Sequence, residues 1–120
     1  MATDDRCCSL APYFKVHAGQ MDAFKALCVQ FVAKTKTEPK CLYYAFTFLE
    51  DQVHCREGYG DAEALLAHLA NVGDLLAQAL KIADIARLEI HGPESELAKL
   101  RGPLAGLNPQ FFALEYGFRN

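Results

Sequence analysis

Hydrophobic and polar residues follow two different periods along this chain, and the changes between them divide it into elements. Alternation with a period of two is typical of strands, whereas apolar residues three and four positions apart are typical of one helix face. The pattern predicts a strand at 7–17, a helix from 20 that is stopped by Pro39, strands at 41–50 and 53–59, helices at 62–70 and 74–80, a strand at 82–91, a short helix at 94–100 and an extended segment at 111–118.

The first predicted helix carries a single apolar stripe and ends near a proline. Its stripe consists of Met21, Phe24, Leu27, Cys28, Phe31 and Val32. Pro39 cannot continue a helix, and it pushes the preceding Glu38 out of helical geometry. Asp61 and Asp74 stand directly before the next two helical segments. A carboxylate at that position accepts a hydrogen bond from a free backbone amide, so we predict both residues as helix N-caps.

The predicted strand at 41–50 is apolar on both faces. One face carries Leu42, Tyr44, Phe46 and Phe48. The other carries Tyr43, Ala45, Thr47 and Leu49. A strand of this kind needs cover on both sides. In a chain this short, its own helices supply one cover, and we expect a second copy of the chain to supply the other.

The order of the first six elements, β-α-β-β-α-β, is that of the ferredoxin-like split βαβ unit. The fold class is therefore predicted as α+β, with helices on one face of an antiparallel sheet. Two such sheets packed face to face form a dimeric α+β barrel, so we expect a homodimer. We expect one domain over 1–120, with its core at about 7–92 and a C-terminal helix and strand within 93–120. The apolar segment 111–118 is expected to add a strand to a sheet edge, with the partner's sheet as the favoured edge.

Composition and charge narrow the choice of partners. Hydrophobic residues make up 52% of the chain and charged residues 22%, which leaves more apolar surface than a small monomer usually shows. The net charge of −3 predicts no nucleic-acid partner. No stretch reaches the roughly 18 apolar residues needed to span a membrane, so no membrane partner is expected. The polar N-terminus and the 5 cysteines, an odd number, predict a cytoplasmic protein with reduced thiols.

Two ionisable residues are predicted to face the interior between the sheet and the helices. His68 lies on an apolar helix face, and Glu57 lies on a mostly apolar strand face. A buried carboxylate without a partner is costly, and His68 is a candidate partner for Glu57. Two interpretations are open: a pair that only packs, or a general base that acts on a bound substrate. The scattered histidines have no metal-binding spacing, so we predict no metal site.

Several motifs, in this order along the chain, resemble a known family. They are Gly19 before the first helix, Glu38-Pro39-x-Cys41-Leu42-x-Tyr44, Glu57-x-Tyr59-x-Asp61, and His68. Together, over roughly residues 12–91, they resemble the antibiotic biosynthesis monooxygenase-like family of small dimeric α+β barrels. Lys40 stands where the family usually has a glycine. The resemblance implies a pocket between the sheet and the helices, with Glu57, Tyr59 and His68 at the positions of the family motif.

By this resemblance the function is that of a cofactor-independent monooxygenase acting on a small aromatic, quinol or polyketide-like compound. We expect His68 as the catalytic residue, in the form of a neutral imidazole that takes a phenol proton. Glu57, Tyr59 and Tyr44 are expected to bind the substrate, without any cofactor. Haem degradation, another activity of the family, is discounted because the chain has no Trp, and no asparagine lies in the first strand.

Two alternatives remain open. The first is a non-catalytic dimeric barrel that binds a small apolar ligand or has only a structural or stress role. The second is another reaction on the same scaffold, such as isomerisation, cyclisation or dechlorination. The fold alone does not decide among them. A cavity that touches His68 would favour the enzymatic interpretations, and a pocket filled by side chains would favour the non-catalytic one.

Overall fold

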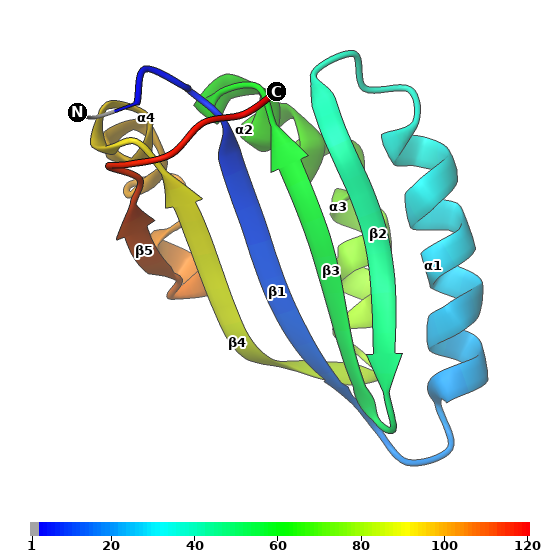
Figure 1. Cartoon of the computed structure of the whole chain (residues 1–120). Coiled ribbons are helices and arrows are strands. Elements are labelled where there is room, and N and C mark those ends of the chain that lie inside the picture. The colour runs from blue at the N-terminus through cyan, green and yellow to red at the C-terminus, as the bar shows by residue number, and fades with distance from the viewer. Residues whose placement is uncertain (1–2) are drawn as a thin grey trace.

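The computed structural model describes residues 3–120 and arranges them as one sheet covered by helices (Figure 1). The strands are β1 (Cys8–Val16), β2 (Cys41–Leu49), β3 (Gln52–Tyr59), β4 (Ala83–Gly92) and β5 (Gln110–Ala113). The helices are α1 (Met21–Thr35), α2 (Ala62–Asn71), α3 (Gly73–Ala79) and α4 (Glu94–Leu100), followed by the short 3-10 helix η1 (Ala105–Leu107). Within 3–120, none of these helices combines the length and the apolarity that crossing a bilayer requires.

The sheet has five strands in the order β2-β3-β1-β4-β5. Neighbouring strands are antiparallel except for β4 and β5, which run parallel. In Figure 1 helices α2 and α3 lie behind the sheet and α1 stands beside β2, while no helix covers the front face, which only the C-terminal tail crosses at its upper end. The predicted α+β class and the ferredoxin-like arrangement of β1 to β4 with α1 and α2 are confirmed.

The hydrophobic core lies between the sheet and the helices and consists of two clusters. One joins β1 and β3 to α1 through Phe14, Val53 and Phe24. The other joins β4 to α2 and α4 and includes Ile90 and Leu65, both completely buried. Burying side chains of this size stabilises the folded state by about 1.5–3 kcal/mol each. Residues of both clusters line the cavity described below.

Helix α1 ends at Thr35, earlier than the predicted stop at Pro39. The Thr37 hydroxyl donates to the Lys34 carbonyl at 2.7 Å, and this side-chain bond satisfies an acceptor that the helix end leaves free. The Glu38 amide then donates to the Thr35 carbonyl at 3.0 Å, which closes a tight turn. Glu38 therefore lies in a turn between α1 and β2, outside the helix.

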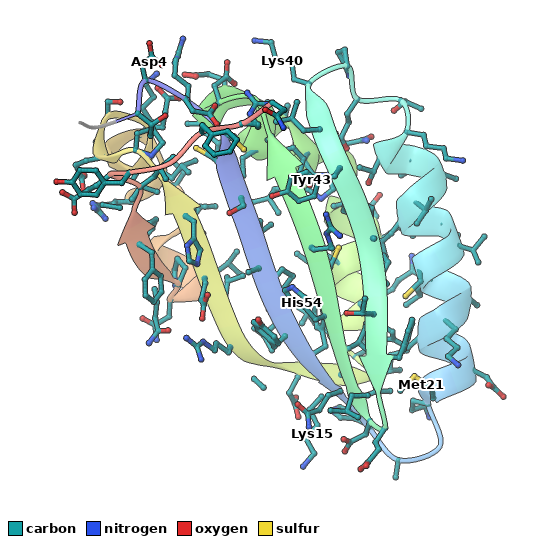
Figure 2. The ribbon with its side chains drawn as sticks, in the orientation of Figure 1. Asp4, Lys15, Met21, Lys40, Tyr43 and His54 are labelled. Carbon is teal, nitrogen blue, oxygen red and sulfur yellow. The ribbon has the colours of Figure 1, made fainter. Side chains whose placement is uncertain are left out.

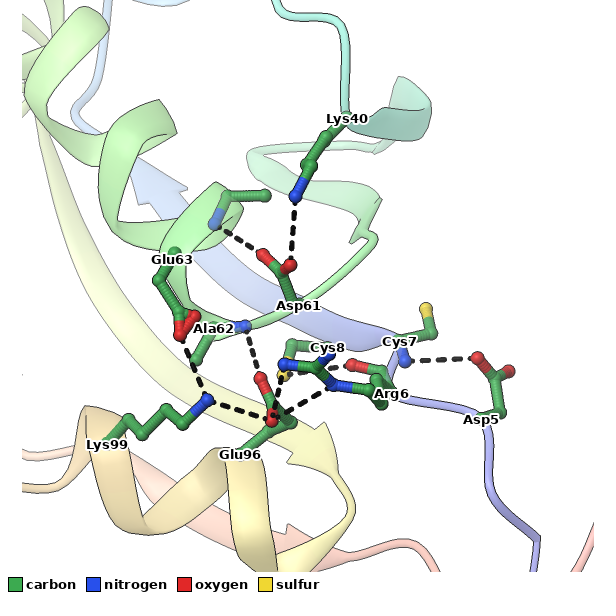
Figure 3. A network of polar contacts seen from close by, with 11 residues as sticks. Asp5, Arg6, Cys7, Cys8, Lys40, Asp61, Ala62, Glu63, Glu96 and Lys99 are labelled. Carbon is green, nitrogen blue, oxygen red and sulfur yellow. Dashed lines mark hydrogen bonds and ion pairs between the residues drawn. The ribbon is translucent and has the colours of Figure 1, made fainter.

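Helix α2 begins at two carboxylates, one of which was predicted. Asp61 accepts from an amide of the first turn at 2.9 Å, as expected for an N-cap. The buried Glu96 of α4 accepts from the Ala62 amide, also at 2.9 Å. Arg6 and Lys99 lie 3.3 and 3.1 Å from Glu96 and balance its charge (Figure 3). This network joins the N-terminal segment, α2 and α4 at one end of the sheet.

The predicted cap at Asp74 is wrong. Helix α3 begins at Gly73, and Val72 occupies its N-cap position without any side-chain hydrogen bond. Asp74 lies in the first turn and is exposed. Val72 is 2% exposed, so its burial in the core, rather than a capping side chain, sets where α3 starts.

The front face of the sheet carries exposed aromatic and aliphatic side chains. Tyr43 and His54 lie in front of the sheet in Figure 2, and Tyr13 stacks on His54 with ring centroids 4.2 Å apart. Gly58 lies against the Tyr43 ring, where an added Cβ would collide with it. β2 is an edge strand, and its Leu49 is 64% exposed. The second cover expected for this strand is thus not supplied by the chain itself.

The C-terminal strand adds to a sheet edge as predicted, but the edge is that of the chain's own sheet and not that of a partner, which we favoured. β5 pairs with β4, and Phe111 lies opposite Ile90. The strand ends at Ala113, short of the predicted end at 118, because its partner β4 ends at Gly92. The tail then runs back to the N-terminal segment, where Arg119 pairs with Asp5 at 3.0 Å.

Candidate active site

A cavity of about 50 Å³ lies between the sheet and the helices. Its walls are mostly aromatic and aliphatic and include Phe24, Phe31, Phe46 and Leu88. The oxygen- and nitrogen-bearing side chains in the wall are Glu57, His68 and Tyr44. Three of the four residues predicted for the site therefore meet at one cavity. The cavity touches His68, but about 50 Å³ is far below the roughly 300–1,000 Å³ of typical ligand pockets, so the cavity alone does not decide between the enzymatic and the non-catalytic interpretations.

His68 lies on the buried face of α2, three positions after Leu65, and is 2% exposed. Its Nε2 is 3.3 Å from Glu57 Oε1. Its Nδ1 is 2.9 Å from Glu38 Oε2. The imidazole therefore bridges two carboxylates, one on β3 and one in the turn after α1.

Glu57 and Tyr59 lie two positions apart on β3, so strand alternation places both side chains on the face that the helices cover. The Tyr59 hydroxyl donates to Glu57 Oε1 at 2.5 Å. Tyr59 is completely buried and lies outside the cavity wall, with its ring centroid 4.9 Å from that of His68. It contacts two residues of the wall, Glu57 and His68, so its position suits support of these side chains rather than direct contact with a ligand.

Tyr44 of β2 completes the polar part of the wall. Its ring centroid is 5.4 Å from that of His68. Burial is the main cause that raises the pKa of the Tyr44 phenol, which keeps it a neutral hydroxyl. Tyr44 also lines a shallow surface groove beside Glu38. It thus stands between the cavity and solvent on that side.

Glu38 is a site residue that sequence reasoning did not single out. Its two carboxylate oxygens lie 2.9 and 3.1 Å from His68 Nδ1, and the Asn71 amide donates to it at 2.8 Å. Its place before Pro39 was the available signal. The inward direction of the side chain depends on the turn after α1, which hydrophobic periodicity does not specify.

The charge of His68 follows from its surroundings. Burial alone would lower the pKa of the imidazole, but hydrogen bonds and charges from Glu57 and Glu38 outweigh it and raise the pKa above 6.5. The two carboxylates therefore stabilise the protonated imidazolium relative to the neutral ring. The role of a neutral His68 imidazole as the base stays a prediction.

Other chemistry at the cavity is limited. Cys55 also lines the wall, and burial raises the pKa of its thiol, so it carries little thiolate character. Across residues 3–120, no three His, Cys, Asp or Glu side chains are grouped so that they could hold a metal ion.

Comparisons with known proteins agree on the fold. No family model matches the chain, and no curated protein does. The crystal structure of MupZ from Pseudomonas fluorescens is 51% identical, covers 96% of this chain and 95% of its own, and superposes with a TM-score of 0.91.

More distant structures share the architecture. An antibiotic biosynthesis monooxygenase, 19% identical, matches 69% of this chain and 92% of its own with a TM-score of 0.61. Rv0793 from Mycobacterium tuberculosis, 18% identical, matches 72% of this chain and 94% of its own with a TM-score of 0.64. The resemblance to the antibiotic biosynthesis monooxygenase-like family is thereby confirmed for the fold.

Proposed function

The chain belongs to the same family as MupZ from Pseudomonas fluorescens, and we propose that it is an enzyme that transforms a small, largely apolar compound by proton transfer at Glu57 and His68. The observation that carries this proposal is the buried Glu57–His68 ion pair in the wall of an otherwise apolar cavity. Ionised groups are costly to bury. An ionisable group with a shifted pKa in a cavity wall, as His68 is here, is typical of functional sites.

Glu57 is the proposed general base. Tyr59 and His68 both contact its Oε1, and the Cys55 thiol also hydrogen-bonds the carboxylate. We propose that its Oε2 accepts the proton from a substrate. The imidazolium of His68 stabilises the anion that forms, and it returns a proton later in the cycle. Tyr44, a neutral phenol in the same wall, is proposed to bind and orient the substrate.

The reaction that we place first is oxygenation without flavin or metal. It is supported by the fold, which is shared with an antibiotic biosynthesis monooxygenase. Glu57 takes a proton from the CH₂ group of an anthrone-type compound, and the resulting carbanion reduces O₂. One oxygen atom becomes a carbonyl oxygen on the former CH₂ carbon. The other leaves as water with the two hydrogens, so atoms and electrons balance.

A second candidate reaction is favoured by the closeness of the acid and the base. Glu57 Oε1 and His68 Nε2 are 3.3 Å apart, so one group can take a proton from a substrate while the other gives one to it. Such a pair suits isomerisation or cyclisation, in which the substrate keeps its atoms and its oxidation state.

The test is O₂ uptake and product mass with a panel of hydroquinones and anthrones. It compares the wild type with Glu57→Gln and with the matched control Glu94→Gln, whose carboxylate is exposed and pairs with Arg101. Oxygenation predicts uptake by the wild type and by the control, with a loss of about a hundredfold or more in Glu57→Gln. Thermal melts of all three proteins show whether the substitutions leave the fold intact.

Each other outcome points to a different conclusion. Uptake that requires added flavin or metal would refute the oxygenation mechanism. Products of unchanged mass that form only when Glu57 is present would support the second candidate. Turnover that survives Glu57→Gln would remove Glu57 from the chemistry. Ligand binding without any turnover would favour the non-catalytic barrel.

A further inference from the structure

Glu38 reaches the buried site from the turn between α1 and β2. It follows α1 in the tight turn closed by its own amide and the Thr35 carbonyl, and Pro39 follows it. The side chain nevertheless turns inward, and only 12% of it is exposed. Removing a carboxylate from water costs free energy unless other groups pair with it and donate hydrogen bonds to it.

Those interactions fix the carboxylate from two sides. Both of its oxygens face His68 Nδ1, at 2.9 and 3.1 Å. Asn71, at the end of α2, donates its side-chain amide to Glu38 at 2.8 Å and to the Lys34 carbonyl at 3.1 Å. Lys34 in turn donates to the Asn71 carbonyl at 3.1 Å. The ends of α1 and α2 are thus joined around the carboxylate, which leaves it little freedom.

The contact determines the arrangement of protons on His68. A carboxylate only accepts hydrogen bonds, so Nδ1 must carry a proton to bond Glu38. Nε2 then faces Glu57 at 3.3 Å. The groups around the ring are the carboxylates Glu38 and Glu57 and the phenols Tyr44 and Tyr59. The cation Lys34 contacts Asn71 and does not contact the ring.

We propose that Glu38 is a positioning residue that fixes the ring orientation of His68 and holds a proton on Nδ1, so that Nε2 works toward Glu57 and the cavity. This inference rests on the proposed function for its catalytic meaning. The geometry itself does not depend on what the substrate is. Support of an imidazole by a carboxylate on its far nitrogen is a general way to set its tautomer and its charge.

The experiment follows the ring signals of His68 by NMR through a pH titration of the full chain. It compares the wild type, Glu38→Gln, Glu38→Asp and the exposed control Glu94→Gln. Removing the charge in Glu38→Gln is expected to lower the titration midpoint of His68 by about one to three pH units. Glu38→Asp is expected to lower it by less, and Glu94→Gln is expected to leave it unchanged.

An unchanged midpoint in Glu38→Gln would overturn the inference. A merely structural Glu38 would lower the melting temperature without moving the midpoint, which also overturns it. If Glu38→Gln does not fold, Glu38→Asp decides in the same way: a lowered midpoint supports the role, and an unchanged one contradicts it.

Turnover separates this inference from the proposed function. If a substrate is found, the alkaline limb of kcat/KM against pH should move to lower pH in Glu38→Gln, because His68 loses its proton earlier. A shifted midpoint with no turnover of any substrate would support Glu38 and count against the proposed function. Turnover that depends on Glu57, with an unmoved midpoint and pH profile in Glu38→Gln, would support the proposed function and overturn the role of Glu38.

Discussion

His68 is 2% exposed and lies between Glu38 and Glu57, and this placement couples folding to pH. The two carboxylates raise its folded-state pKa above 6.5, the value taken for an unperturbed imidazole. The folded state therefore binds the proton more tightly than the unfolded state does. The stability gained is fully present below pH 6.5 and is lost as the pH rises through the folded-state pKa.

We predict that the free energy of unfolding of the wild type falls over the interval above pH 6.5 in which folded His68 loses its proton. The fall should be smaller in His68→Gln, which cannot take up the proton. Urea denaturation at constant ionic strength measures both slopes. A wild-type stability that increases over this interval would contradict the raised pKa of His68.

Tyr59 makes one identified side-chain hydrogen bond, in which its hydroxyl donates to Glu57 Oε1 at 2.5 Å inside the core. Tyr59→Phe removes the donor and leaves the ring, so we predict a loss of about 1.5–3 kcal/mol in the free energy of unfolding. The control is Tyr116→Phe, because Tyr116 is 73% exposed. It should change stability by less than about 0.5 kcal/mol. Equal effects of the two substitutions in chemical denaturation would count against the buried hydrogen bond.

Secondary structure was predictable wherever one period dominates a segment. The stripe that begins at Met21 and the alternation around Tyr44 placed α1 and β2 close to their observed bounds. The same alternation put Glu57 and Tyr59 on one face of β3, and helix spacing put His68 on the buried face of α2. The neighbours Glu57 and His68 were thus within reach of sequence reasoning.

The features that the sequence did not predict correctly share a physical cause. Helix α1 ends early because Thr37 satisfies a terminal carbonyl, and α3 starts where burial places Val72 rather than at a cap on Asp74. Glu38 enters the site through a turn whose direction depends on tertiary contacts with Asn71. Hydrophobic periodicity describes which face of an element is buried, and it carries no information about the direction in which a turn points a side chain.

The start of α2 offers a direct test of capping. Asp61→Ala removes the carboxylate that accepts from the Ala64 amide at 2.9 Å, so we predict a loss of about 0.5–2 kcal/mol in the free energy of unfolding. Asp74→Ala is the matched control in the neighbouring helix, where no side chain caps the start. It should cost less than about 0.5 kcal/mol. Similar costs for the two variants would mean that Asp61 does not act as a cap.

The uncovered front face of the sheet is the candidate interface between two copies of the chain. It presents Tyr13, Tyr43 and Leu49, which are 37%, 38% and 64% exposed, and the helices cover only the other face (Figure 1). Large apolar side chains exposed on one uncovered sheet face indicate an interaction site. We propose that two copies pack through this face as a two-fold homodimer, with a total interface above about 2,000 Å².

We predict a dimer at micromolar concentration for the wild type and a monomer for Tyr13→Lys, because a lysine on each copy would bring buried charge to the centre of the proposed interface. Val29→Lys is the control, since Val29 is 70% exposed on α1, away from the sheet. Light scattering coupled to size exclusion measures the mass of each. A wild-type monomer, or a dimer that persists in Tyr13→Lys, would contradict packing through this face.

The charge state of His68 is the measurement that tests the proposed site most directly. The chain has 4 histidines, and loss of one set of signals in His68→Gln assigns its ring nitrogens in a ¹H–¹⁵N spectrum. We expect the titration midpoint of wild-type His68 to lie above 6.5, with both ring nitrogens protonated below that midpoint. A neutral ring with a midpoint at or below 6.5 would contradict the imidazolium held between Glu38 and Glu57, and with it the assignment of acid and base.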